Sequence, residues 1–291
     1  MSYDSAMTKP FRWTIAKREQ LGTLVSGAQP TMERAFLSEL RHTAARTLAI
    51  ADDADLAFIG RTPENLYDYL SGAFAGLKNT PKLHLVQFSL RWLESEGGLA
   101  LKPKNVAAIA AYLREERVDP AAIARRPRPL ALVDVVADGG TMRSLTHILH
   151  LLARRGGVDW NAVQRRLRII GLRTREKNSP NTWRWQQNQD WLHLIPDVEI
   201  KNVSADWKFI YHITGSQPKV TTSFHPGRWS EPEAGRPDLS AERREAIALA
   251  ARLYDLGRTR EERRALSQRI ARTVQMRQPA TRALALSLRH G

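Results

Sequence analysis

Short apolar runs alternate with amphipathic segments between residues 32 and 175. The apolar runs are typical of buried strands, and they predict strands at 56–59, 83–88, 130–136 and 167–172. Between these runs, apolar residues recur at helical spacing and predict helices at 32–50, 62–77, 106–117 and 144–155. Strands interleaved with helices predict an α/β fold, in which helices flank a mostly parallel sheet.

The pattern changes after residue 173. Tryptophans are interleaved with basic residues from there to about residue 230, and apolar positions alternate between Val198 and Ile213. Such alternation predicts a small antiparallel sheet with an aromatic core, which we call the hood. Trp faces and Arg side chains of the hood also suit a planar or phosphorylated ligand.

Turn residues and helix caps divide the rest of the chain. Residues 216–238 are rich in Pro and Gly and predict a linker. Ser240 then precedes a helix that stops near Gly257, and Thr259 begins a capping box for a second helix. We expect both helices to pack on the core, with dimerisation or an anionic polymer as alternatives. The predicted parts are an N-terminal arm (1–34), an α/β domain with the hood from about 173 (35–215), the linker (216–238) and a C-terminal helical segment (239–291).

Composition narrows the class of protein. The 291 residues, 42% of them hydrophobic, suffice for one substantial core. There are no cysteines, which excludes disulfides, thiolate metal sites and a cysteine nucleophile. No apolar run reaches the roughly 18 residues of a membrane span, so we expect a cytoplasmic protein. The net charge of +15 attracts phosphorylated substrates or nucleic acid, and nucleic acid is less favoured because no known binding motif is present.

The segment from Leu130 to Met142 carries the clearest chemical signal. Its apolar strand contains one carboxylate, Asp134, which is costly to bury unless something binds it. A glycine-rich turn before a helix follows, and such a turn presents backbone N–H groups to an anion. We predict that this turn binds phosphate, although Asp-Gly is also a common turn pair. The turn consists of Asp138, Gly139, Gly140 and Thr141.

A second loop of this kind follows the strand at 56–59. Gly60, Arg61 and Thr62 offer backbone donors, a fixed positive charge and a hydroxyl. Thr62 also suits the N-cap of the next helix, and Arg61 also suits a surface ion pair. Ligands of parallel sheets bind outside the carboxyl ends of the strands, where the strand order switches. We therefore expect both loops to face one cleft.

Together the two loops resemble the type I phosphoribosyltransferases over about residues 35–175. The family motif has an apolar strand, two acidic residues, two small apolar residues and a Gly-Gly-Thr turn; Val133 stands at the first acidic position and Asp134 at the second. The resemblance implies that Asp134 holds the ribose hydroxyls of phosphoribosyl pyrophosphate. It also implies that the turn holds the 5′-phosphate and that residues 60–62 receive the pyrophosphate.

The resemblance further implies a variable hood that recognises the acceptor, and a mobile catalytic loop after the second strand. Arg91, Lys102 and Lys104 lie in the region of that loop, but no motif assigns them a role. The histidines form no close metal-binding pair. We interpret His193, His212 and His225 of the hood region as packed or surface residues.

We predict an enzyme that transfers or processes a phosphoribosyl group, with Asp134 and Arg61 as its catalytic residues. Mg²⁺ would assist the departure of pyrophosphate, and Asp134 is its candidate ligand. Val133 and the positive charge favour an alternative, a non-catalytic regulator that senses phosphoribosyl compounds or nucleotides and binds nucleic acid. A sugar-phosphate hydrolase is a third hypothesis, and a homodimer is left open.

Overall fold

A parallel five-stranded sheet forms the centre of the computed structural model, which describes residues 11–25, 30–88, 94–95, 98–99, 103–176, 185–222 and 236–291. The strand order is β2-β1-β5-β6-β7, and every neighbouring pair is parallel. The predicted α/β fold with a parallel sheet is therefore confirmed. The strands are β1 (Asp55–Ile59), β2 (Leu83–Val86), β5 (Leu130–Val135), β6 (Leu167–Thr174) and β7 (Glu199–Ala205).

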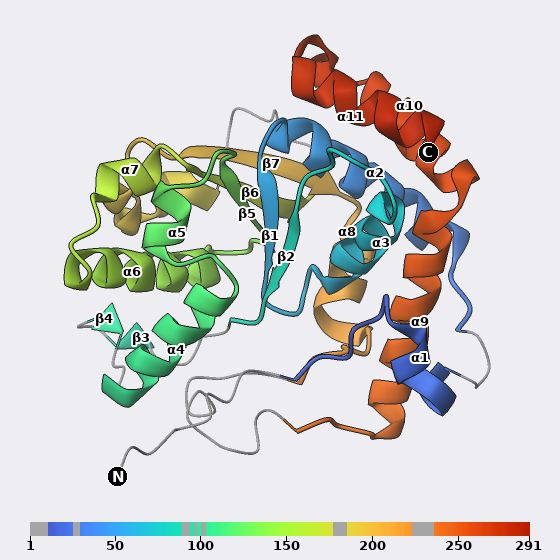
Figure 1. The fold of residues 1–291 in the computed structure, drawn as a ribbon, viewed down its shortest axis with the longest axis horizontal. Coiled ribbons are helices and arrows are strands. Elements are labelled where there is room, and N and C mark those ends of the chain that lie inside the picture. The colour runs from blue at the N-terminus through green and yellow to red at the C-terminus, as the bar shows by residue number, and fades with distance from the viewer. Residues whose placement is uncertain are drawn as a thin grey trace.

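Helices cover both faces of this sheet (Figure 1). One face packs against α2 (Arg34–Ala51), α3 (Glu64–Phe74), α8 (Trp207–Tyr211) and the C-terminal helices. The other face packs against α4 (Pro103–Glu115), α5 (Pro120–Ala124), α6 (Gly140–Arg155) and α7 (Trp160–Gln164). Short strands β3 (Glu94–Ser95) and β4 (Gly98–Leu99) pair separately, and α1 (Arg18–Leu21) lies near the N-terminus. No helix among the described residues is long and apolar enough to cross a membrane.

Strict alternation along the strands explains why the sheet is buried on both sides. In β1, Leu56 and Phe58 enter the core below α2 and α3, whereas Ala57 and Ile59 enter the core below α6. Such strands appear in the sequence as continuous apolar runs, because neither face meets water. The boundaries predicted for these strands agree with the structure within two residues, for this reason.

The prediction of an antiparallel hood is wrong. Residues 199–205 form β7, which extends the main sheet in parallel to β6. The following aromatic segment is the helix α8, because the Asp206 side chain accepts a hydrogen bond from the Lys208 backbone N–H and so caps a helix. Trp207 and Tyr211 of that helix are 58% and 66% exposed. Trp183 and Trp229 lie outside the described residues.

The C-terminal helices pack on the core, as expected. They are α9 (Ala241–Arg258), α10 (Arg260–Ala271) and α11 (Pro279–His290), of which α11 was not predicted. Ser240 and Thr259 cap α9 and α10 with their hydroxyl groups, as predicted. Leu253, Leu266 and Leu284 enter the core shared with α2 and α3.

Two glycines let α3 and α9 touch through their backbones. A Cβ atom on Gly72 of α3 would overlap the carbonyl group of Tyr254, and one on Gly257 of α9 would overlap the carbonyl oxygen of Tyr69. Neither obstacle is a side chain that can rotate away. The close approach of the two helices therefore requires glycine at both positions.

We expect Gly72→Ala and Gly257→Ala each to lower the free energy of unfolding by about 1–3 kcal/mol, as overpacking does. In an unobstructed helix the same change would stabilise by about 1 kcal/mol, so the sign of the effect is diagnostic. Urea denaturation measures it. Gly215→Ala, where a Cβ meets nothing within 4 Å, is the matched control and should cost little. A neutral or stabilising effect at Gly72 would contradict the close contact.

Candidate functional site

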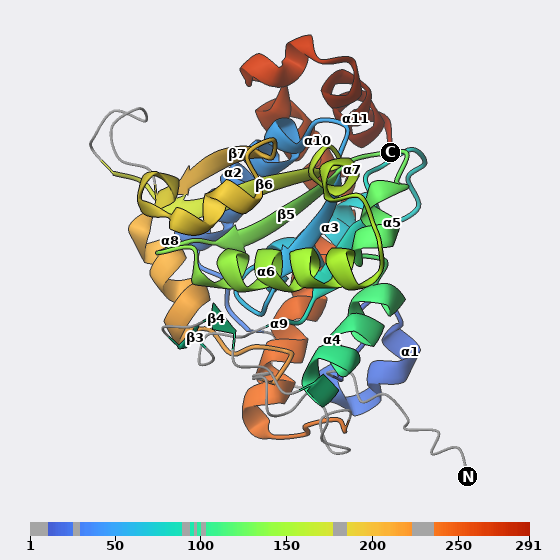
Figure 2. The same cartoon turned by 90° about the vertical axis from the view of Figure 1, so that its left-hand side faces the viewer.

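The two predicted loops lie next to each other at one edge of the sheet. They follow β1 and β5, which are hydrogen-bonded neighbours with Phe58 opposite Val133. The helices that leave these strands, α3 and α6, cover opposite faces of the sheet (Figure 2). The strand order therefore switches between β1 and β5, and open parallel sheets bind their ligands at such a point.

The loop after β5 has the turn that the sequence predicts. Gly139 has φ of +82° and stands at the N-cap of α6, so that the chain enters the helix in a left-handed conformation. The Gly140 N–H donates to the exposed carboxylate of Asp138 over 3.1 Å. Asp138 therefore acts as a turn residue in the structure, the second of the two roles considered for it. The Thr141 hydroxyl donates instead to Asp134.

Asp134 is a buried carboxylate without a cation. It is 5% exposed, and its Oδ1 accepts the Val135 N–H over 2.7 Å. Burial raises the pKa of Asp134 to about 8, and the hydrogen bonds from Val135 and Thr141 oppose this shift only in part. No Lys, Arg or His of the described residues forms an ion pair with it. A carboxylate is rarely kept in such surroundings for stability alone.

Val133 enters the opposite core from Asp134. Successive residues of a strand point to opposite faces, and Val133 is fully buried in the core shared with α2 and α3. A carboxylate there would lie among apolar side chains. Valine at the first acidic position of the motif is thus explained by packing.

Trp185 covers the turn after β5, which the sequence did not predict. A Cβ on Gly139 would lie 2.6 Å from the Trp185 ring, and one on Gly171 of β6 would lie 3.0 Å from its Nε1. Trp185 Nε1 donates to Asn202 Oδ1 over 2.9 Å, and the ring stacks on Trp191 with 6.1 Å between centroids. Gly139 and Gly171 leave the space that the indole fills. Both tryptophans are buried, so this part of the hood region is core.

The loop after β1 differs from its prediction in one respect. α3 begins at Glu64, and Pro63 occupies the N-cap without a side-chain hydrogen bond, so Thr62 is not the cap. Gly60 has φ of +74°, and its N–H donates to the Val86 carbonyl. Thr62 instead belongs to a turn in which the Glu64 N–H donates to the Arg61 carbonyl oxygen, so the helix starts one residue later than predicted.

Arg61 is half-buried and points toward the segment before α9. Its Nη1 lies 3.4 Å from the Thr221 carbonyl oxygen, a long contact for a hydrogen bond. Burial lowers the pKa of Arg61, and Glu64 opposes that shift. The predicted surface ion pair is therefore not the arrangement that the structure shows.

Glu64 belongs to a buried polar cluster that sequence reasoning missed. It accepts the Val220 N–H over 2.8 Å, and burial raises its pKa while Arg12 and Lys219 lower it. Burial also lowers the pKa of Lys219 to about 8. Arg12 pairs with Asp68 over 2.7 Å one turn further along α3. The partners are far apart in the sequence, so no local signal indicates the cluster.

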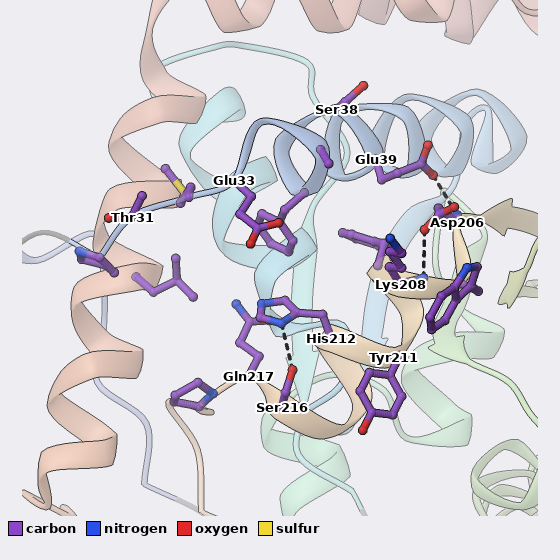
Figure 3. Close-up of a pocket in the computed structure, with 18 of the residues that line it drawn as sticks. Thr31, Glu33, Ser38, Glu39, Asp206, Lys208, Tyr211, His212, Ser216 and Gln217 are labelled. Atoms are coloured by element: carbon purple, nitrogen blue, oxygen red, sulfur yellow. Dashed lines mark hydrogen bonds between the residues drawn. The ribbon is translucent and has the colours of Figure 1, made fainter.

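A cavity of about 830 Å³ lies elsewhere, between α2, α8 and α9 (Figure 3). His212 lines it and its Nδ1 lies 2.9 Å from the Ser216 hydroxyl. The cavity is lined by neither residues 60–62 nor residues 134–141. It thus provides no support for the predicted site.

The remaining candidates add little. Arg91, Lys102 and His225 lie outside the described residues, whereas Lys104 and His193 are exposed. Within the ranges that the structure describes, no three His, Asp or Glu side chains gather as metal ligands. In comparisons with known proteins, no family model, curated protein or solved structure matches this chain.

We expect Asp134→Asn to stabilise the ligand-free protein in a pH-dependent way. The pKa of Asp134 is about 8 in the folded chain and about 4 in the unfolded chain, so the folded chain binds the extra proton between these values. Wild-type stability therefore falls as pH rises through this window, by about 1.4 kcal/mol per pH unit at most, whereas the Asn variant lacks this loss.

Chemical denaturation at several pH values tests this prediction. The variant should be more stable by a few kcal/mol near pH 8, and the difference should vanish near pH 4. Asp138→Asn, an exposed carboxylate nearby, is the control and should change little at either pH. A pH-independent difference at Asp134 would show that the carboxylate is not destabilised by burial.

Proposed function

We propose that this protein binds phosphoribosyl pyrophosphate, or a related phosphorylated sugar, at the carboxyl ends of β1 and β5, and that it transfers the phosphoribosyl group to an acceptor. The observation that carries the proposal is Asp134, a buried carboxylate with no described cation. It lies beside a glycine-rich turn at the start of a helix. A sugar that presents hydroxyl groups and a phosphate complements these two features.

The turn supplies the phosphate subsite. α6 begins at Gly140 and is 16 residues long, and the first N–H groups of a helix have no partner within it. These groups and the helix dipole favour a dianion at this end. The left-handed Gly139 lets the backbone approach the ligand, and the Trp185 ring behind it keeps water from that side. Thr141 can donate its hydroxyl to the phosphate when Asp134 turns to the ribose.

Asp134 would accept hydrogen bonds from the ribose hydroxyls. Hydrogen bonds to an ionised carboxylate are stronger than those between neutral groups, and the low dielectric around Asp134 strengthens them further. Ligand binding would thus compensate the burial of the charge and favour its ionised form. Asp134 alone would carry this role, because Val133 lies on the other face of the sheet.

Arg61 would bind the pyrophosphate. Its guanidinium lies in the neighbouring loop, and its one described hydrogen bond is the long contact to Thr221. A planar guanidinium matches two phosphate oxygens at once. In the reaction the bond between the anomeric carbon and pyrophosphate breaks, positive charge develops on that carbon, and the acceptor supplies the new bond. Arg61 stabilises the negative charge that pyrophosphate takes with it.

Mg²⁺ fits this donor set. The ion needs few protein oxygens when substrate phosphates supply the others, and the carboxylate of Asp134 would be its protein ligand. When bound, Mg²⁺ would neutralise charge on the departing pyrophosphate.

Calorimetry with phosphoribosyl pyrophosphate and Mg²⁺ tests the proposal. We expect Asp134→Asn to weaken binding at least ten-fold, since a hydrogen bond to a charged group contributes about 1.5–3 kcal/mol. Asp138→Asn is the matched control, because the amide oxygen can also accept the Gly140 N–H, and its affinity should stay within about two-fold. Equal affinity in wild type and Asp134→Asn would remove Asp134 from this role.

Product analysis separates transfer from the alternatives. Release of pyrophosphate that requires a nucleobase from a panel would support transfer, and release of free phosphate would indicate a hydrolase. Tight binding without turnover would indicate a sensor. Absence of binding would contradict all three hypotheses.

A further inference from the structure

A second cavity, of about 480 Å³, lies at the opposite edge of the sheet. It is formed by the end of α4, by α5 and its flanking residues, and by the start of β2, so it lies at the end of the sheet away from the loops after β1 and β5. Its lining is strongly basic, with Asp119 as the acidic residue. The basic side chains are Lys82, His84, Arg114, Arg117, Arg125 and Arg126.

One of these basic side chains, Arg126, already has partners within the protein. Arg126 pairs with Asp55 over 2.7 Å, donates to the Arg117 carbonyl oxygen over 3.0 Å, and contacts His84 Nε2 over 3.1 Å. Burial and the neighbouring Arg126 lower the pKa of His84 to about 4, so its imidazole is neutral at pH 7. Arg126 and His84 thus form a fixed wall of the cavity.

The other four cations have exposed side chains and form no ion pair within the part of the chain that the structure describes. They are Lys82, Arg114, Arg117 and Arg125. Asp119 carries one negative charge against these four and forms no described ion pair with them; its Oδ1 caps α5 by accepting the N–H groups of Ala121 and Ala122. Like charges gathered without partners repel one another, and an anion bound among them would relieve that repulsion.

Arg117 adopts a left-handed backbone conformation that is unfavourable for arginine. It has φ of +58°, where glycine is the usual residue, and the bond from Val118 N–H to the Leu113 carbonyl marks the helix end as a Schellman motif. The other non-glycine residues with positive φ in the described ranges are Asp52 and Asn79, types that tolerate this conformation. An arginine that lines a cavity from such a position suggests a use for its charge.

An adjoining cavity of about 350 Å³ shares Arg114, Asp119 and Ala121 with the first. Its other lining is mainly apolar, and Arg155 of α6 stands beside it. The apolar lining residues are Ala110, Pro120, Leu152 and Val158. Figure 1 shows α4, α5 and α6, which carry most of this lining, on the same side of the sheet.

We propose that the two cavities together bind one nucleoside di- or triphosphate. The phosphates would lie among Arg114, Arg117 and Arg125, and the base would lie on the apolar lining beside the Arg155 guanidinium. Cavities of this size suit a single small ligand, whereas a nucleic acid needs a continuous basic groove. The site is independent of the phosphoribosyl site, because the two share no residue.

Calorimetry at low salt with ATP, GTP, CTP, UTP and tripolyphosphate tests this proposal on the full chain. Arg114→Gln with Arg125→Gln should weaken every ligand at least ten-fold, because each removes a charged hydrogen bond to phosphate. Arg155→Gln should weaken the nucleotides and leave tripolyphosphate unchanged. Arg154→Gln, the exposed neighbour that lines neither cavity, is the matched control and should leave all affinities within about two-fold.

Arg117→Gly provides a second test of the site if the Arg114/Arg125 double variant does not fold. Glycine suits the left-handed position, so this variant should melt no lower than wild type while binding nucleotides more weakly. No saturable binding, or equal affinity in wild type and the Arg114/Arg125 variant, would overturn the proposal. It would also be overturned if tripolyphosphate bound as tightly as the nucleotides, or if a DNA oligonucleotide bound more tightly than they do.

Discussion

Hydrogen bonding between β1 and β5 is the constraint on which the rest of this structure depends. The two strands are separated by 70 residues of chain, from 60 to 129, yet they pair from Asp55 with Leu130 to Phe58 with Val133. The helices that follow them, α3 and α6, pack on opposite faces of the sheet, so neither connection passes over the ends of both strands. The pairing thereby brings together a glycine-rich turn, a buried carboxylate and an arginine loop. Without it, the turn and the carboxylate of one segment would be unrelated to the arginine loop of the other.

The interior of the sheet could be predicted from sequence because burial on both faces leaves a direct signal. Runs such as Leu130 to Val133 are apolar without interruption, and the helices between the strands are long and amphipathic. Alternation after Val198 was harder to interpret. A period of two identifies a strand but not its partner, and the partner proved to be β6 of the main sheet.

Competition between strand propensity and helix capping explains another difference between the predicted and the observed structure. Trp207 and Tyr211 are residues that favour strands, yet Asp206 caps a helix at that point and leaves both side chains largely exposed. Asp134 could be predicted, because a charge in an apolar strand is costly wherever the strand lies. The contact of Trp185 with Gly139 could not, since nothing near either residue indicates the other. The same holds for Glu64 and Val220, which meet across 156 positions.

The close contact of α3 with α9 at Gly72 and Gly257 has a consequence for how the loops after β1 and β5 can move. α3 starts directly after the arginine loop, and its C-terminal half touches α9 backbone to backbone, which leaves no room for the two helices to roll or slide. The arginine loop is therefore held close to the C-terminal helices. The turn after β5 is instead covered by the Trp185 side chain, which forms one hydrogen bond to Asn202 and stacks on Trp191. Side chains can rearrange where backbones cannot, so we expect the turn beneath Trp185 to move more readily than the arginine loop.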